Sequence, residues 1–233
     1  MIHDFRSVAK EGKNHWWRYL IGFLIVFIIF QGLGSVPLLV TCQTLECDEG
    51  KIGGSVVPYL SLLLFQFPIC LVGVFIVIKL LHRRTVLSVL TSRNKFDWER
   101  YFFSLQVFGI LYLVVTLFSI IFDNSLIYRN PNIFEFFSAL LIFVTLLPIQ
   151  AAFEESFYRG YVYQGFSLII RNKFLLMIVT SLVFAVPHLM NPETSELGFL
   201  LYFSIIFLMG FQFVIIVVLD EGLEIVMAYH LVN

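Results

Sequence analysis

The sequence predicts an all-α fold, a polytopic transmembrane helical bundle. Hydrophobic residues make up 59% of the 233 positions and charged residues 13%, which is about half the charged share of a soluble domain. The mean hydropathy is +0.90, and several apolar runs are long enough to cross a bilayer. We therefore expect one membrane-embedded domain, residues 19–233, preceded by a cytoplasmic tail, residues 1–18.

Six full spans are predicted, at residues 19–40, 56–78, 102–122, 133–152, 174–190 and 197–219. Trp16 and Trp17 before the first span are typical of an interface anchor. The polar stretch at residues 91–101 predicts a short interfacial helix capped by Asn94 or Asp97. A loop at residues 123–132 separates the third span from the fourth, and the fifth span is short and contains Pro187.

A shortened seventh segment runs from Ile225 to Asn233. Its nine residues cannot cross ~30 Å of hydrocarbon. We expect either that the natural sequence continues past Asn233 or that this segment is re-entrant, and we favour the first alternative.

The distribution of charge predicts the orientation. Thirteen of the 15 Lys and Arg residues fall in alternate polar segments, beginning with the N-terminal one. The positive-inside rule then places the N-terminus in the cytoplasm, in a multi-pass protein of a bacterial plasma membrane. The net charge of -1 excludes a basic nucleic-acid binder. Cys42 and Cys47 lie in one outer loop, either as a disulfide or as free thiols.

Two adjacent glutamates follow the fourth span. The stretch AAFEESFYRGYVYQG, residues 151–165, places Glu154, Glu155 and Arg159 after a long apolar run. A charged side chain at membrane depth costs roughly 3 kcal/mol on insertion scales, so we expect a compensating partner. On a helix, Glu155 and Arg159 share a face and can pair, whereas Glu154 points about 100° away. We predict that Arg159 holds Glu155 and that Glu154 stays available for chemistry.

Two histidines occur in later apolar segments, His188 in FAVPHLMNPE and His230 in AYHLVN. Taken singly, each is more typical of a structural contact, a local hydrogen bond for His188 and an interhelical contact for His230. Ionisable groups in membrane spans usually face the bundle interior, so these histidines are expected to converge with the glutamates. A carboxylate and an imidazole around one water form a general base, and a second imidazole can donate to an oxyanion.

The remaining polar residues are predicted to have structural roles. Residues 199–213 indicate a lipid-facing helix in which Gln212 makes a packing contact. The acidic cluster Asp220, Glu221 and Glu224 is interpreted as a solvated or interfacial turn.

At the glutamates and histidines the sequence resembles the CPBP family of intramembrane proteases, which includes the CAAX prenyl endopeptidases and bacteriocin-processing or immunity proteins. The family motif EExxxR corresponds to residues 154–159, and FxxxH to residues 184–188. The resemblance implies that Glu154 activates water with assistance from His188. It also implies that Glu155 and Arg159 orient the site and that Phe184 packs beside it.

The third family motif, HxxxN, begins at His230. Its asparagine would fall at position 234, one residue past Asn233, which we take as a supporting residue. The resemblance implies that His230 helps to form the oxyanion hole, in a glutamate protease with no catalytic metal and no other cofactor. Glu and His also bind zinc, so a metal held by Glu154, His188 and His230 stays an alternative, although no HExxH motif is present.

The leading hypothesis is an intramembrane endopeptidase that hydrolyses a peptide bond of a membrane-associated protein or peptide near the cytoplasmic face. Its partners would be membrane lipid and that substrate, with no nucleic acid. Processing of a bacteriocin, or immunity to one, follows by analogy, and prenyl-protein processing ranks lower. The alternative is a non-enzymatic membrane immunity or scaffold protein of the same fold, in which Glu155, Arg159 and the histidines hold helices together.

Overall fold

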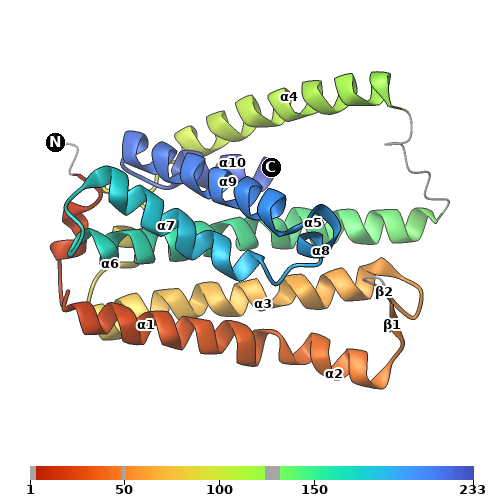
Figure 1. Ribbon diagram of the computed structural model, residues 1–233, viewed down its shortest axis with the longest axis horizontal. Coiled ribbons are helices and arrows are strands. Elements are labelled where there is room, and N and C mark those ends of the chain that lie inside the picture. Colours follow the sequence, from red (N-terminus) through yellow and green to blue (C-terminus); the bar gives the residue numbers. More distant parts are fainter. Residues whose placement is uncertain (1–3, 49–50, 124–131) are drawn as a thin grey trace.

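The computed structural model describes residues 4–48, 51–123 and 132–233, which form a helical bundle (Figure 1). The predicted all-α class is confirmed. In the described residues the strands β1 (Cys47–Asp48) and β2 (Lys51–Ile52) form a two-residue antiparallel hairpin. Most of the predicted loop at residues 123–132 lies outside the described residues.

Five helices of the described chain are long and apolar enough to cross a membrane, judged by length and composition. The first combines α1 (Trp16–Ile28), η2 (Ile29–Gly34) and α2 (Val36–Thr44). The second combines α3 (Val56–Ile76) and η3 (Val77–His82). The third is α4 (Trp98–Phe122), and the fifth is α9 (Phe199–Asp220). The fourth combines α5 (Ile133–Glu154), η6 (Glu155–Val162) and α6 (Tyr163–Ser167).

The prediction of six full spans is wrong by one, because the helix at residues 174–190 is too short. This helix, α7 (Lys173–His188), has 16 residues, and at 1.5 Å per residue it is about 24 Å long. The hydrocarbon core is ~30 Å thick. The seventh segment is α10 (Glu224–Val232), with nine residues.

The spanning helices pack in a small number of pairs. Figure 1 shows α1, α2 and α3 along one edge of the bundle and α4 along the opposite edge. The most extensive contacts are those of α3 with α5, of α7 with α9, and of α10 with α4. Three short helices complete the described chain, namely η1 (Ser7–Lys10), η4 (Val86–Val89) and α8 (Glu193–Leu197).

The connection before α4 is not the interfacial helix that the sequence predicted. Its backbone pairs instead with the turn between α9 and α10, where Ser92 N donates to Glu221 O at 3.1 Å and Leu223 N donates to Leu90 O at 2.8 Å. These bonds replace those of a local helix. Asp97 does cap a helix, since its Oδ1 accepts from Arg100 N at 3.1 Å at the start of α4.

Two features near the ends of the bundle complete the fold. The described part of the predicted tail packs against the bundle, because Phe5 is buried and its N–H donates to the Glu221 carboxylate. Before α3, Cys42 at the end of α2 and Cys47 in β1 form a disulfide with their Cα atoms 5.2 Å apart. Of the two alternatives that the sequence left open for these cysteines, the disulfide is the one present.

Candidate active site

The site residues come from three places in the bundle. Glu154 is the last residue of α5, and Glu155 and Arg159 follow it in η6. His188 is the last residue of α7, and His230 lies in α10. The change from α-helix to π-helix therefore falls between the two glutamates. Short π-helical insertions are frequent at functional sites.

Glu155 is the centre of a buried ionic group. Its Oε1 lies 3.0 Å from Arg159 Nη1 and 2.6 Å from His230 Nδ1. The side chains of Glu155 and Arg159 have no exposed surface. The predicted pairing within one helical turn is present, and the contact to His230 joins η6 to α10.

Aromatic rings surround the Arg159 guanidinium. Its Cζ lies 4.0 Å from the centroid of the Phe184 ring and 4.9 Å from that of the Phe213 ring. Its Nη2 also lies 3.5 Å from the carbonyl oxygen of Gly210. A desolvated cation over an aromatic face gains about 2 kcal/mol. Phe184 therefore packs on Arg159.

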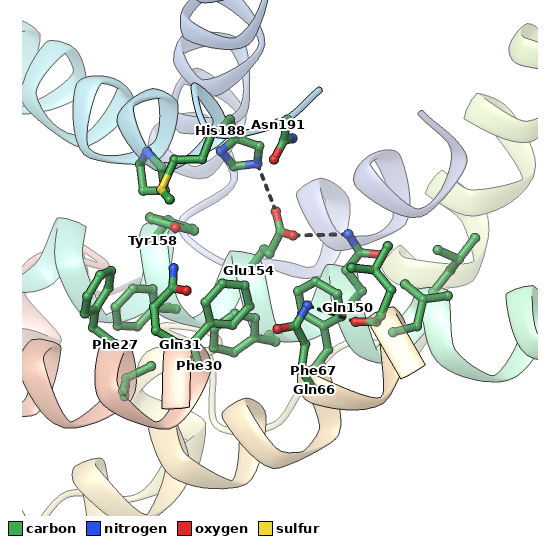
Figure 2. Close-up of a pocket in the computed structure, with 18 of the residues that line it drawn as sticks. Phe27, Phe30, Gln31, Gln66, Phe67, Gln150, Glu154, Tyr158, His188 and Asn191 are labelled. Carbon is green, nitrogen blue, oxygen red and sulfur yellow. Dashed lines mark hydrogen bonds and ion pairs between the residues drawn. The ribbon is translucent and has the colours of Figure 1, made fainter. Parts of the chain in front are cut away.

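The two carboxylate oxygens of Glu154 have different surroundings (Figure 2). Oε1 accepts a hydrogen bond from Gln150 Nε2 at 3.2 Å. Oε2 faces two imidazoles, with His188 Nε2 at 4.0 Å and His230 Nε2 at 3.8 Å. These separations are too long for direct hydrogen bonds. They suit a bridging water, which would bring a carboxylate and two imidazoles around one reactive molecule.

The other ring nitrogen of each histidine is held by a partner. His188 Nδ1 lies 2.7 Å from the carbonyl oxygen of Phe184, to which only an N–H can donate. A neutral His188 therefore presents Nε2 as an acceptor on the side of Glu154. His230 Nδ1 likewise donates to Glu155, so its Nε2 accepts when the ring is neutral and donates when it is protonated.

A cavity of about 490 Å³ opens in front of Glu154 and His188. Its walls are mainly phenylalanine and leucine side chains from α1, η2, α3 and α5, and its polar groups include Gln31, Gln66, Gln150 and Asn191. A second cavity of about 260 Å³ adjoins His230 and is lined by Leu147, Gln150, Ala151, His230, Leu231 and Asn233. Gln150 lines both cavities. Asn233 Nδ2 lies 3.1 Å from Met209 Sδ.

Sequence reasoning missed several residues that contribute to the site. Gln150 lies four residues before Glu154, the same spacing that predicted the pairing of Glu155 with Arg159. The sequence could therefore have predicted this contact. Gly210 and Phe213 were assigned to a lipid-facing helix, which is wrong for the inner face of α9. That face is buried against η6 and α7, and the even apolar composition of α9 gives no sign of which face is inside.

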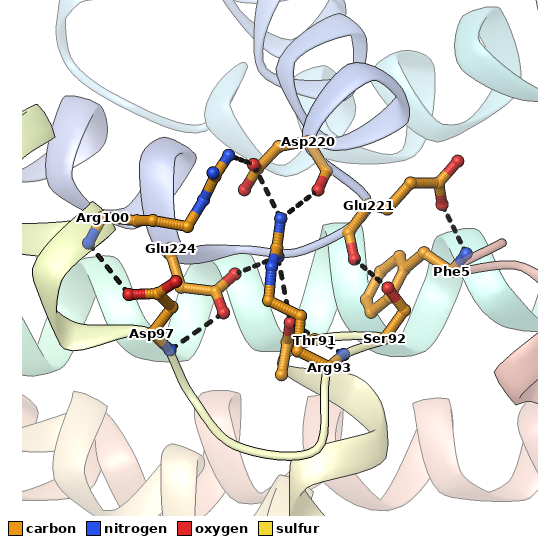
Figure 3. Close-up of polar contacts among 9 residues, drawn as sticks. All are labelled: Phe5, Thr91, Ser92, Arg93, Asp97, Arg100, Asp220, Glu221 and Glu224. Atoms are coloured by element: carbon orange, nitrogen blue, oxygen red, sulfur yellow. Dashed lines mark hydrogen bonds and ion pairs between the residues drawn. The ribbon is translucent and has the colours of Figure 1, made fainter. Parts of the chain in front are cut away.

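Of the two alternatives for the acidic turn, solvated or interfacial, the solvated one is wrong for Asp220 and Glu224 (Figure 3). Asp220 and Glu224 are buried, and Arg93 bridges them, with Nη2 at 3.0 Å from Asp220 Oδ1 and Nη1 at 3.1 Å from Glu224 Oε2. Arg100 also pairs with Asp220. Burial raises the pKa of Glu224 above its ordinary value, while the Asp97 N–H and Arg93 oppose that rise. The cluster anchors α10, which carries His230.

Across the described ranges, no three His, Cys, Asp or Glu side chains form a group that could hold a metal ion. The sequence left open a metal held by Glu154, His188 and His230. In the structure, Glu154 Oε2 lies 4.0 Å from His188 Nε2 and 3.8 Å from His230 Nε2.

Comparisons with known proteins find a relative along most of the chain and a family match in its second half. The chain is 28% identical over 197 residues to the uncharacterized protein YyaK of Bacillus subtilis (strain 168). That match covers 80% of this chain and 65% of the relative, so the chain spans less than two thirds of the relative's length. No solved structure matches the chain. Residues 135–233 match the family described as type II CAAX prenyl endopeptidase Rce1-like, and this segment contains all the residues grouped around Glu154 and Glu155. The chain thus carries, over residues 135–233, a domain of the Rce1-like type II CAAX prenyl endopeptidase family.

Proposed function

We propose that this protein is an intramembrane endopeptidase that hydrolyses a peptide bond of a membrane-associated protein or peptide. The observation that carries the proposal is the position of Glu154 Oε2, which faces the Nε2 atoms of His188 and His230 at 4.0 and 3.8 Å. One water between these three atoms would be polarised by a carboxylate and would lie beside the apolar cavity through which a substrate segment reaches it.

In the proposed reaction, Glu154 Oε2 takes a proton from the water as its oxygen attacks the scissile carbonyl carbon. His188 orients the water, because its neutral Nε2 is an acceptor. The C–N bond then breaks, and the proton on Glu154 passes to the leaving nitrogen, which gives a carboxylic acid and an amine. Gln150 holds Oε1 and so keeps Oε2 directed at the water. A positioned acid–base group of this kind typically increases the reaction rate about 10²–10⁴-fold.

His230 is proposed to stabilise the oxyanion. A protonated His230 donates from Nε2, and the Glu155 carboxylate at 2.6 Å from Nδ1 favours that protonated ring. Arg159 shares the same carboxylate oxygen at 3.0 Å, which limits how much of the Glu155 charge acts on His230. Asn233, which follows α10 and lines the smaller cavity beside His230, is proposed as a supporting residue.

The proposed location is a bacterial plasma membrane, with the N-terminus in the cytoplasm. The N-terminal segment, the connection between α3 and α4, and the turn between α6 and α7 lie at the same end of the bundle (Figure 1). These segments contain 13 of the 15 Lys and Arg residues when Arg18, Arg100 and Lys173, in the first turns of the adjoining helices, and Arg159 in η6 are counted with them. The hairpin of β1 and β2 lies at the opposite end. This asymmetry supports a cytoplasmic N-terminus, and the Bacillus relative supports a bacterial source.

The proposal is tested with purified full-length chain in proteoliposomes that contain a panel of fluorogenic membrane-anchored peptides. New termini are identified by mass spectrometry. We expect cleavage by the unmodified chain and none by Glu154→Gln, which keeps the shape of the side chain and should remain folded. A folded Glu154→Gln protein that still cleaves the panel rules out the role of Glu154. Parallel assays with a chelator and a metal analysis decide whether a bound metal contributes.

The alternative is a non-enzymatic membrane immunity or scaffold protein of the same fold. The contacts of Glu155 with Arg159 and His230 favour it, since they tie η6 to α10 without any reaction. In a producer-strain or partner-binding assay a scaffold should tolerate Glu154→Gln, because that change leaves these contacts intact. An enzyme should not.

A further inference from the structure

The large cavity contains two glutamines that the proposed reaction does not use. Gln31 lies in η2 and Gln66 in α3, and both line the cavity. Figure 2 shows them on the wall opposite Glu154, Tyr158 and His188, among phenylalanine rings. Two amides from different spans thus meet the same apolar space.

Gln31 is exposed, and its side chain makes no hydrogen bond to any residue that the structure describes, although it lies within a helix long and apolar enough to cross a membrane. It projects into the cavity from the π-helical segment between α1 and α2. An amide without a partner at membrane depth costs several kcal/mol in hydrocarbon. The exposed amide of Gln31 is therefore accessible to a polar group that enters the cavity from the membrane.

Gln66 is buried, and half of its amide is satisfied. Its Nε2 donates to Leu63 O at 2.9 Å, which leaves Oε1 with no partner in the described chain. A close approach of the two helices keeps Gln66 next to η2. A Cβ atom at Gly34 would lie only 2.8 Å from the Gln66 Cβ, so a glycine is needed there for this packing.

The rest of the lining restricts the chemistry of the ligand. Besides Tyr158, only Glu154 and His188 among the lining residues carry an ionisable group. A charged ligand would find no counter-charge at the glutamine wall. A pure hydrocarbon would leave both amides unpaired. A peptide in extended conformation offers an N–H and a C=O, together with apolar side chains for the phenylalanine walls.

We propose that Gln31 and Gln66 form a subsite that binds the backbone of an extended, uncharged, apolar peptide segment next to the bond that is cut. Gln66 Oε1 accepts from a peptide N–H, and Gln31 Nε2 donates to a peptide C=O. A helical segment already uses these backbone groups internally, so the subsite selects substrate that has unwound. The identity of the cut bond rests on the proposed function, but the binding itself does not require catalysis.

The test measures binding in the full-length Glu154→Gln protein in lipid nanodiscs. The probe is a dansyl-labelled, end-blocked octapeptide of Leu, Phe, Ala and Gly. Adding Gln31→Leu or Gln66→Leu should raise the Kd about tenfold each, the usual effect of one lost hydrogen bond of this kind. Gln212→Leu is the matched control, because Gln212 is exposed on α9 and does not line the cavity, and it should leave the Kd unchanged.

A second probe separates backbone recognition from packing. Octapeptides that carry one N-methylated backbone amide, scanned along the peptide, should include one that binds about tenfold more weakly to the Glu154→Gln protein. For that peptide, Gln66→Leu should cause no further loss. This measurement also serves if a leucine variant fails to fold, because the scan alone requires only the parent protein.

Equal Kd values for the parent, Gln31→Leu and Gln66→Leu proteins overturn the subsite, and so does a failure of the octapeptide to bind at all. The subsite is also overturned if N-methylation at every position of the octapeptide leaves the Kd unchanged. The proposed function fails separately. A peptide that binds with dependence on both glutamines but is never cut by the unmodified chain supports the subsite and contradicts the peptidase.

Discussion

Glu155 and His230 are 75 residues apart in sequence, and Glu155 Oε1 lies 2.6 Å from His230 Nδ1. This contact determines which nitrogen of His230 faces Glu154. Because Nδ1 is bonded to the carboxylate, Nε2 is turned toward Glu154 Oε2 at 3.8 Å. The second glutamate of the pair therefore fixes the orientation of His230 relative to Glu154.

Replacing Arg159 with alanine should lower both stability and activity. The change leaves the Glu155 carboxylate buried with His230 as its remaining partner, and removing one partner of a buried pair costs about 3–5 kcal/mol. The free energy of unfolding of the purified protein in detergent measures the effect. Arg171→Ala is the control, since Arg171 is exposed in the turn before α7 and should be neutral. An Arg159→Ala protein as stable as the unmodified chain would show that Arg159 does not compensate Glu155.

Replacing Gln150 with leucine should reduce kcat about 10- to 100-fold and leave KM nearly unchanged. The hydrogen bond from Nε2 to Glu154 Oε1 at 3.2 Å is lost, and a bond to a charged group is worth about 1.5–3 kcal/mol. Steady-state kinetics on any peptide that the unmodified chain cleaves provides the measurement. A rise in KM with kcat intact would instead assign Gln150 to substrate binding in the cavities it lines.

Replacing Gly210 with alanine should destabilise the packing of α9 on α7. An added Cβ would lie 2.8 Å from Phe184 Cδ1 and 3.6 Å from Arg159 Nη2, so the ring that covers Arg159 must move. Overpacking of this kind costs typically about 1–3 kcal/mol. The matched variant is Gly109→Ala on α4, where no atom lies within 4 Å and the change should be neutral or slightly stabilising. Equal thermal midpoints for the two variants would contradict the close packing at Gly210.

Replacing Arg93 with alanine should destabilise the protein by roughly 3 kcal/mol, because Asp220 and Glu224 lose the cation that bridges them. Arg93 is itself partly exposed, so the lower end of the usual range applies. The same change should weaken activity, since this cluster holds the first residue of α10, the helix that carries His230. Lys95→Ala, at an exposed position two residues along, is the control for both the unfolding and the activity assays. Loss of activity with full stability would show that the cluster acts on the site without holding the fold.

Local patterns in the sequence were sufficient for much of this protein. The lengths of apolar runs located the five long apolar helices, because hydrophobicity over about 20 residues is a local property, but they also counted the shorter α7 as a sixth full span. The spacing of Glu155 and Arg159 predicted their pairing for the same reason, since residues one helical turn apart must share a face. The position of Gln150 relative to Glu154 follows the same rule.

The tertiary structure decided which distant groups meet. No periodicity indicates that Arg93 approaches Asp220 and Glu224, or that Gly210 and Phe213 turn toward Arg159, because those contacts depend on how whole helices pack. In α9 the apolar residues continue around the helix, so hydrophobicity does not distinguish the face against η6 from the face against lipid. The sequence thus determined where the helices lie and which near neighbours pair. Packing determined which side chains surround Glu154.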